Sequence, residues 1–258
     1  MKKINIIKIG GNIIENTDEL NTFLSLFSKM DGPKILVHGG GKKANQILEK
    51  MGKTPKMVNG RRITDIESLD VAIMVYGGLT NKKIVAKLQS LKCNAIGLSG
   101  ADANTILANK RPVKEIDYGF AGDVNKVNSK TISALLNLEL TPVFCALSHN
   151  GRGQLLNTNA DTIASVIAIG LSKNYNTTLN YCFELDGVLK NRNDKSSVIK
   201  KINSASYATL VSNEVINDGM LPKIDNCFKA LKQGVTEVRI GNLGLFKKES
   251  THYTTLVL

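Results

Sequence analysis

Tryptophan is absent from this chain of 258 residues, and aromatic side chains make up only 5% of it. Proteins that bind single-stranded nucleic acids use aromatic rings as stacking surfaces for the bases. Lys and Arg number 34 against 22 Asp and Glu, a net charge of +12, but the lysines are scattered rather than gathered beside aromatic residues. We therefore expect no nucleic-acid partner. An anionic small substrate and a generally lysine- and asparagine-rich proteome remain as explanations of the charge.

Long hydrophobic runs are also lacking. The longest, residues 163–171, contains Ser165 and Gly170 and is far shorter than the roughly 20 residues that a membrane-spanning helix needs. Near the N-terminus, Lys8 and the following glycines interrupt the apolar stretch before it reaches the ~7–15 residues of an export signal. We expect a cytoplasmic protein with no membrane partner.

Histidine and cysteine are both scarce. The three histidines and four cysteines form no Cys-x-x-Cys motif and no Cys/His pair with metal-ligand spacing. The sequence therefore predicts no metal site built from side chains, and it predicts reduced, buried thiols at Cys93, Cys145, Cys182 and Cys227. An apolar fraction of 42% with only 5 prolines excludes a disordered or low-complexity chain.

Short β-rich apolar segments alternate with helical patterns along the whole chain. This alternation is typical of a three-layer α/β/α sandwich whose central sheet is mainly parallel. We expect one domain over residues 1–258, with a soft boundary that separates an N-terminal lobe (1–173) from a C-terminal lobe (174–258). Strands are expected at 4–9, 34–38, 95–99, 142–147, 179–183, 237–240 and 254–258, and hairpin-forming edge strands within 111–128. Helices are expected at 17–30, 42–50, 64–89, 129–138, 160–171, 206–213 and 222–233. The third of these helices is expected to start with a capping box from Thr64 to Glu67.

A lysine stands at the end of the first expected strand, in Lys8-Ile9-Gly10-Gly11. Ligands of open α/β sheets bind beyond the carboxyl ends of the strands. A lysine on a sheet face that helices cover needs a partner, because an unpaired buried cation is costly. The alternative is an edge-strand lysine whose flexible chain reaches solvent.

Three glycines follow the second expected strand, in His38-Gly39-Gly40-Gly41. Such a turn lets backbone N–H groups approach an anion beside a helix N-terminus. The segment matches neither a Walker motif nor a dinucleotide fingerprint, and a tight strand-to-helix connection is the alternative use of its glycines. His38 is predicted to pack at the strand end rather than act as a base.

Two further groups of polar residues stand at or near helix starts. Arg61 and Arg62 precede the long expected helix, and a guanidinium can bind a carboxylate with two parallel hydrogen bonds, although a double arginine is also typical of a solvated surface. Asp161 lies in the first turn of an apolar helix, where it can orient cations, and Lys223 begins another helix.

Taken together and in this order, these segments resemble the amino-acid kinase superfamily and, within it, the N-acetylglutamate kinases. The resemblance extends from Ile6 to Gly241, and aspartokinases and uridylate kinases share the first segment but lack an NGxRxT segment. The matching segments are IKIGG (7–11), VHGGGKKAN (37–45), VNGRRITD (58–65), NAIGLSGAD (94–102), GFAGDV (119–124), LLNTNADTIAS (155–165) and GMLPK (219–223).

The resemblance implies an amino-acid kinase fold and transfer of the γ-phosphoryl group of ATP to the side-chain carboxylate of an N-acylglutamate. ATP would bind with Mg²⁺ held mainly by its phosphates. Lys8 and Lys223 would stabilise the transferring group, and Asp161 would orient both lysines. The implied substrate-binding residues, on the N-terminal lobe, are Gly40, Gly41, Arg62, Asn157 and Asn159; the implied nucleotide-binding residues are Gly10, Gly11, Asp186, Gly187 and Lys223, with the C-terminal lobe as the nucleotide-binding lobe.

The chain departs from the family pattern in four places. Phe183-Glu184 replace a Thr- or Ser-Asp pair that lines the nucleotide, and Asp218 replaces a glycine. Lys42 stands where a proline is common, and Arg61 where the family residue is usually uncharged. These two extra cations suggest a substrate with an additional carboxylate, N-succinylglutamate; the alternative is that both side chains are solvated.

Family members that arginine inhibits carry an extra helix before the first strand. Because the first strand is expected to begin at Ile4, the resemblance implies an arginine-insensitive homodimer. A glutamate or uridylate kinase of the same superfamily is the nearest alternative. A non-catalytic regulator that binds ligands on this fold is another, and Phe183-Glu184 would suit it.

Overall fold

The computed structural model describes residues 1–58, 61–191, 193–194, 196–216, 220–247 and 252–258. Its centre is an eight-stranded sheet, in which β13 and β14 are antiparallel and the other neighbouring pairs are parallel. The mainly parallel sheet is thereby confirmed. In spatial order the strands are β12 (Lys201–Ile202), β14 (Thr254–Leu256), β13 (Glu237–Gly241), β11 (Tyr175–Cys182), β1 (Lys2–Ile9), β2 (Lys34–His38), β8 (Thr141–Cys145) and β5 (Ala95–Leu98).

Strand β1 shows why the sheet is covered on both faces. Ile4 and Ile6 belong to one buried apolar cluster, and Ile7 and Ile9 belong to another. Successive side chains of a strand point to opposite faces, so the two clusters are the cores on either side of the sheet. Lys8 has the same parity as Ile4 and Ile6 and therefore points to their face.

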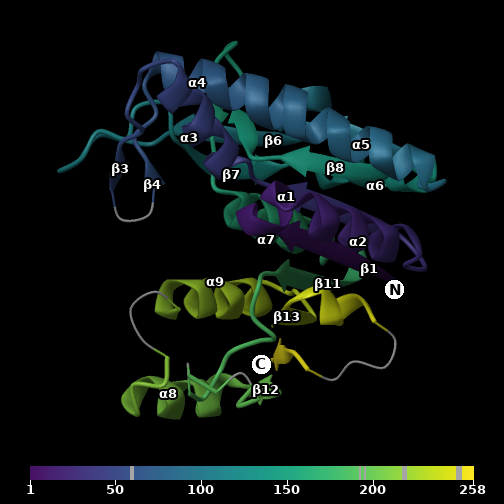
Figure 1. The fold of residues 1–258 in the computed structure, drawn as a ribbon. Helices are drawn as coiled ribbons and strands as arrows, with labels where there is room; N and C mark the ends of the chain where they lie inside the picture. The colour runs from purple at the N-terminus through teal and green to yellow at the C-terminus, as the bar shows by residue number, and fades with distance from the viewer. Residues whose placement is uncertain (59–60, 192, 195, 217–219, 248–251) are drawn as a thin grey trace.

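Helices supply the outer two layers. The core that contains Ile4 and Ile6 also contains residues of α3 (Gly41–Lys50), α4 (Ile66–Ala72), α6 (Ser129–Asn137), α7 (Ala160–Leu171) and α9 (Leu221–Lys232). The core on the opposite face, which contains Ile7 and Ile9, includes residues of α1 (Gly11–Glu15), α2 (Thr17–Ser28) and α5 (Asn81–Ser90). The three-layer α/β/α architecture is confirmed. In Figure 1, α8 (Ser204–Ser212) and α9 lie below β1, and α4 and α5 lie above it.

Two smaller sheets lie beside the main one. A four-stranded sheet has the order β10 (Leu155–Asn157), β9 (Leu147–His149), β6 (Ile106–Lys110) and β7 (Gly122–Val127), and β3 (Met57–Val58) pairs with β4 (Arg61–Arg62). The hairpin expected within 111–128 therefore begins earlier, because its first strand ends at Lys110 and residues 111–121 connect it to β7. The strand expected at 142–147 is two strands interrupted at Ala146.

The expected capping box at Thr64 is wrong. Thr64 is fully buried, and Asp65 caps α4 instead, with its Oδ1 accepting from the Ser68 N–H at 2.8 Å. The helix that follows is continuous to Ser90 but passes through a π-helical segment, η1 (Ile73–Thr80). The remaining short elements are the 3₁₀ turns η2 (Asp102–Asn104) and η3 (Leu243–Phe246).

The four cysteines are all free and buried, as predicted. Burial raises the pKa of Cys145 and of Cys182 to about 12, so neither thiol ionises at neutral pH. None of the helices within the described ranges has the length and apolar character that a membrane crossing requires.

Candidate active site

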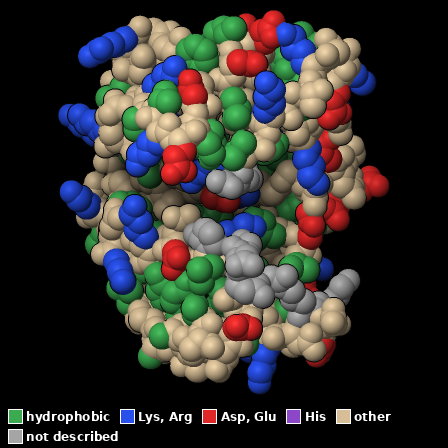
Figure 2. All heavy atoms as spheres, turned by 90° about the vertical axis from the view of Figure 1, so that its left-hand side faces the viewer, with side chains coloured by type: hydrophobic (Ala, Val, Ile, Leu, Met, Phe, Trp, Pro, Cys, Tyr) green, Lys and Arg blue, Asp and Glu red, His purple; other side chains and the backbone are tan. Residues whose placement is uncertain are grey.

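The carboxyl ends of four neighbouring strands meet at one edge of the main sheet. Ile9 is level with both Cys182 and His38, and His38 is level with Cys145. Beyond this edge lies a cavity of about 590 Å³. Figure 2 shows the hollow that crosses the middle of this face, with Lys and Arg side chains on both halves around it. The cavity is where ligands of parallel sheets bind.

The charge of the cavity lining is strongly one-sided. Among its described lining residues, one carboxylate faces six basic side chains. The carboxylate is Asp161, and the basic residues are Lys8, Lys42, Arg61, Arg62, Arg111 and Lys223. A site with this excess of positive charge favours anionic ligands.

Lys8 and Asp161 form an ion pair, with 2.9 Å between Nζ and Oδ1. Because β1 lies inside the sheet and Lys8 faces α7, the alternative of an edge lysine that reaches solvent is wrong. Asn159 caps α7 and fixes its first turn, since its Oδ1 accepts from the Asp161 N–H at 2.7 Å. The Lys8 and Asp161 side chains are 11% and 28% exposed, so the pair stands at the cavity wall within reach of a ligand.

Lys223 extends into the same cavity from the first turn of α9. Its Nζ lies 4.6 Å from the centroid of the Phe183 ring, and the Lys8 Nζ lies 4.9 Å from the same centroid. The structure thus brings together two lysines that are 215 positions apart in the sequence. Asp218 and Gly219, which precede Lys223 in the matching segment, lie outside the described residues.

The glycine turn after β2 forms another part of the wall. A Cβ on Gly40 would lie 2.6 Å from Cδ1 of Tyr76, so only glycine lets the chain pass so close to that ring. Gly41 begins α3, and the first N–H groups of a helix have no partner within it. Gly40, Gly41 and Lys42 line the cavity, so the start of α3 lies where an anion could bind.

His38 stands just before this turn and is fully buried. Its Nδ1 lies 2.7 Å from the Gly39 carbonyl oxygen and its Nε2 lies 3.0 Å from Nδ2 of Asn81. Burial lowers the pKa of His38 to about 4, and the hydrogen bond to Gly39 opposes that shift. The ring is therefore neutral at pH 7, donating from Nδ1 and accepting at Nε2, and the prediction that it packs at the strand end is confirmed.

Arg62 is buried in the cavity wall next to α3. Its Nη2 donates to the Gly41 carbonyl at 2.9 Å, while Nη1 is buried without a hydrogen-bond partner among the described residues. Thr64 links this segment to the predicted substrate residue Asn157, whose Nδ2 donates to the Thr64 Oγ1 at 2.9 Å. Asn59 and Gly60, which begin the same motif, lie outside the described residues.

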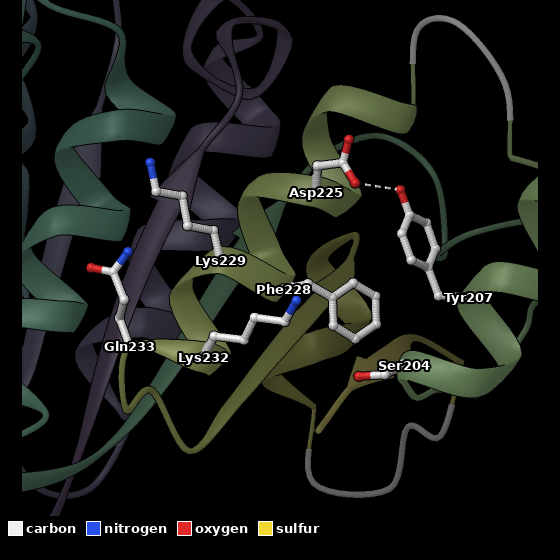
Figure 3. Close-up of a pocket in the computed structure, with 7 residues that line it drawn as sticks. All are labelled: Ser204, Tyr207, Asp225, Phe228, Lys229, Lys232 and Gln233. Carbon is white, nitrogen blue, oxygen red and sulfur yellow. Dashed lines mark hydrogen bonds between the residues drawn. The ribbon is translucent and has the colours of Figure 1, made fainter.

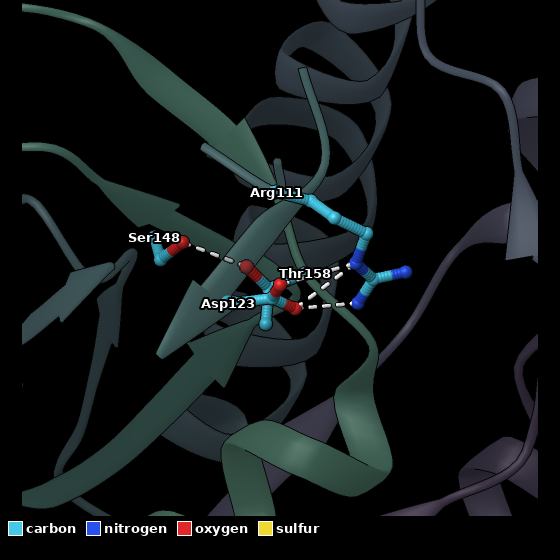
Figure 4. A network of polar contacts seen from close by, with 4 residues as sticks. All are labelled: Arg111, Asp123, Ser148 and Thr158. Atoms are coloured by element: carbon cyan, nitrogen blue, oxygen red, sulfur yellow. Dashed lines mark hydrogen bonds and ion pairs between the residues drawn. The ribbon is translucent and has the colours of Figure 1, made fainter. Parts of the chain in front are cut away.

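Arg111 is a cavity residue that the sequence did not single out. Figure 4 shows its guanidinium beside Asp123, with Thr158 and Ser148 close by. Nη2 and Nε donate to Oδ1 of Asp123 at 2.5 and 3.1 Å, and the Ser148 and Thr158 hydroxyls are 2.7 Å apart. Arg111 follows β6 in a connection without a recognisable motif, so only the pairing of β6 with β7 places it here.

Only some of the predicted nucleotide-binding residues line the active-site cavity. Gly11 lines the cavity, and so does the predicted substrate residue Asn159, but Gly10, Asp186 and Gly187 are outside its described lining. Asp186 accepts a hydrogen bond from Asn242. A Cβ on Gly187 would lie 2.6 Å from the Thr254 Oγ1. The roles of these residues stay predictions.

A second cavity, of about 460 Å³, lies between α8 and α9. Figure 3 shows the Tyr207 hydroxyl directed at Asp225, to which it donates at 2.6 Å. Burial, reinforced by this hydrogen bond, raises the pKa of Tyr207 to about 12. None of the predicted site residues is among its lining residues, so we place the chemistry in the first cavity.

The chain is similar to known proteins along nearly its whole length. A model of the amino acid kinase family matches residues 3–242. The acetylglutamate kinase of Cytophaga hutchinsonii is 55% identical, with 93% of this chain and 91% of that protein covered, and that of Bacteroides fragilis is 52% identical, with 93% and 92% covered.

The chain is also similar in fold to solved structures. A protein of Streptococcus mutans UA159, smu.665, is 26% identical with a TM-score of 0.78 and covers 100% of this chain and 99% of its own. Carbamate kinase from Giardia lamblia shares the fold. It is 12% identical, with a TM-score of 0.73, and the match covers 99% of this chain and 98% of that one. The two relatives named above are acetylglutamate kinases, and the chain belongs to the amino acid kinase family.

Proposed function

We propose that this chain transfers the γ-phosphoryl group of ATP to the side-chain carboxylate of an N-acylglutamate, giving an acyl phosphate and ADP, as a step of arginine biosynthesis. N-acetylglutamate is the first candidate, because acetylglutamate kinase is the name of its relatives. The observation that carries the proposal is the Lys8–Asp161 ion pair in a cavity that Arg62 and Lys223 also line.

The reaction needs charge stabilisation rather than proton transfer. A glutamate side chain, with a pKa of about 4.3, is ionised at neutral pH. One of its oxygens would form the new bond to the γ-phosphorus while the bond from that phosphorus to the bridging oxygen breaks and the charge passes to ADP. Because two anions must meet, cations beside the transferring group supply most of the catalysis. We assign this role to Lys8 and Lys223. Asp161 is ion-paired with Lys8, and we propose that it orients both lysines when the substrates are bound.

Arg62 is suited to bind the α-carboxylate of the substrate. Its guanidinium lines the cavity, and a carboxylate there would accept a charge-assisted hydrogen bond from it. Asn157 lines the same cavity, and its side chain is already oriented by Thr64. It would offer its amide oxygen to the N–H of the acylamino group.

The residues present fit a Mg²⁺ ion that arrives with ATP. Among the described residues no group of three His, Cys, Asp or Glu side chains could hold a metal ion, and Asp161 is already paired with Lys8. Phosphate oxygens and water would therefore supply most of the ligands, as is common for Mg²⁺. When bound, the ion would neutralise phosphate charge.

We further infer that residues 1–173 form the acylglutamate lobe and 174–258 the nucleotide lobe, with Asp186 and Gly187 at the nucleotide. The boundary falls between the end of α7 and the start of β11. A homodimer in the cytoplasm is the expected form, and the mass measured by light scattering during gel filtration tests the dimer.

A hydroxylamine trap for acyl phosphate tests the activity. The purified chain is incubated with ATP, Mg²⁺ and, in separate reactions, free glutamate, N-acetylglutamate, N-succinylglutamate or UMP, with ADP release measured in parallel. We expect a hydroxamate with an acylated glutamate. Turnover with free glutamate alone would identify the chain as a glutamate kinase. ADP release with UMP alone would identify it as a uridylate kinase. No turnover with any acceptor would favour a ligand-binding regulator.

Two exposed cations favour a second candidate substrate, N-succinylglutamate. Arg61 and Lys42 both line the cavity, and an additional carboxylate on the acyl group would meet positive charge there. Replacing Arg61 with glutamine should then lower kcat/KM for the succinyl substrate about tenfold and leave the acetyl substrate within about twofold. A clear preference of the native chain for the acetyl substrate would rule out this candidate.

A further inference from the structure

Phe183 directly follows β11 at the edge of the sheet where the cavity lies. Cys182, the last residue of that strand, is level with Ile9, and the Phe183 N–H donates to the Gly241 carbonyl at 2.8 Å. The backbone of Phe183 is thus fixed between the ends of β1 and β13. Its side chain is half-buried and belongs to none of the steps derived so far.

The ring of Phe183 contacts both lysines of the cavity. The centroid lies 4.9 Å from the Lys8 Nζ and 4.6 Å from the Lys223 Nζ, within the roughly 6 Å at which a cation is attracted to a ring face. Two ammonium groups that share one neighbour repel each other, and Lys223 is exposed, so without this attraction its flexible chain would extend into water.

A second pair of contacts holds the ring itself. Tyr181 lies almost parallel to Phe183, with centroids 6.1 Å apart and planes at 8°. Tyr181 is 4% exposed, and its hydroxyl donates to the backbone carbonyl of Asp161 at 3.3 Å. The orientation of Phe183 is therefore tied to the helix turn that carries the partner of Lys8.

An aromatic ring can hold a cation without cancelling its charge. A carboxylate in the place of Phe183 would also attract both lysines, but it would compete with the phosphoryl group for them and repel it. We propose that Phe183 is a positioning residue of this site, whose ring keeps the ammonium groups of Lys8 and Lys223 directed at the transferring phosphoryl group while leaving them fully charged. This inference rests on the proposed function.

Replacing Phe183 with leucine removes the ring face and retains an apolar side chain. We expect kcat to fall about tenfold while KM for ATP and for the acylglutamate stays within about twofold, because the lysines act on the transition state. Phe183→Tyr keeps the ring and should stay within about threefold of the native kcat. Phe183→Met, also without a ring, gives a second test if the leucine variant does not fold.

A matched control is available at Phe120. Its ring contacts the Lys110 ammonium at 5.0 Å, and neither residue is among the described lining of the active-site cavity. Phe120→Leu therefore removes the same kind of contact elsewhere and should retain the native kcat. Thermal unfolding of every variant identifies losses that reflect unfolding.

A double-mutant cycle separates positioning from general support of the fold. If Phe183 acts through Lys223, the tenfold loss from Phe183→Leu should shrink to about threefold in a Lys223→Ala background, where only Lys8 still depends on the ring. Three outcomes would overturn the inference: native kcat in both ring-less variants, an unchanged tenfold loss in the Lys223→Ala background, or a rise in KM for ATP with kcat unchanged. If the native chain forms no acyl phosphate, the proposed function fails instead.

Discussion

The two sides of the active-site cavity are held together in different ways. On one side, hydrogen bonds join segments that are far apart in the sequence: Arg62 to Gly41, and Asn157 to Thr64. On the other, Lys223 projects from the start of α9, is exposed, and contacts the ring of Phe183. On the first side hydrogen bonds already orient the side chains of Arg62 and Asn157 in the free protein. On the second side the position of Lys223 depends on an aromatic contact.

This difference suggests a division of labour. Groups that are fixed in the free protein can bind the substrate equally in the ground state and the transition state, and their loss raises KM. Cations that meet charge as it develops on the phosphoryl group act chiefly on kcat. Lys8 belongs to both sides, because it is ion-paired with Asp161 and also contacts Phe183.

The largest effect is expected at Lys8. In Lys8→Arg the charge is kept, but a planar guanidinium cannot reproduce the compact ammonium that pairs with Asp161 at 2.9 Å. We expect kcat to fall about 10³-fold, or about 4 kcal/mol in activation free energy, with KM changed less than about fivefold. Steady-state kinetics at saturating ATP measure it, and a variant with near-native kcat would contradict the role of Lys8.

The next largest effect is expected at Lys223, where we expect kcat to fall a few hundredfold in Lys223→Ala. Lys223→Ala removes one of the two cations at the phosphoryl group, a loss comparable to removal of one stabilising donor in other enzymes, roughly 10²–10³ in kcat. Because Lys223 is exposed, the thermal unfolding midpoint should hardly change. Unchanged turnover would remove Lys223 from the mechanism and would break the comparison between the two sides.

Acid should destabilise the fold through His38, which precedes the glycine turn at the cavity wall. Its pKa is about 4 in the fold, against about 6.5 when unfolded, so between these values the unfolded chain binds a proton that the folded chain does not. The free energy of unfolding should therefore decrease as the pH falls from 6.5 to 4, by up to about 3 kcal/mol.

Urea unfolding across this pH range measures the decrease. His38→Gln keeps an amide that can bond to the Gly39 carbonyl and Asn81 but does not titrate, and its curve should be flatter in this window. An equally steep curve for that variant would assign the pH dependence to other groups.

Local sequence rules predicted the main sheet well because each strand carries its own signal. Ile4 to Ile9 and Lys34 to His38 are short, apolar and followed by glycine, and both became central parallel strands. The rules failed where packing against a distant segment determines the local structure. Thr64 matches a capping pattern, but its burial leaves the cap to Asp65. The connection between β6 and β7, residues 111–121, is too long for its turn residues to fix the register of the hairpin.

The candidate site shows the same limit. Lys8, Arg62, Asp161 and Lys223 were each ambiguous alone, and their order along the chain, matched to a family, singled them out. Arg111 lies in no such motif, and Phe183 was noted only as a departure from the family pattern. Their places depend on strand pairing, and no property of the isolated segments indicates that one will line the cavity and the other will lie between two lysines.

The smallest of these effects, at Arg62, tests the hydrogen-bonded side directly. Arg62→Ala removes the guanidinium that we assign to the substrate α-carboxylate and also its bond to Gly41. We expect KM for the acylglutamate to rise about 30-fold, close to 2 kcal/mol, with kcat within about threefold and KM for ATP unchanged. Arg111→Ala is the matched comparison, because Arg111 lines the same cavity but is already neutralised by Asp123, and it should raise that KM less. If Arg62→Ala lowered kcat as strongly as Lys223→Ala does, both sides of the cavity would act on the transition state, and the division of labour proposed here would be wrong.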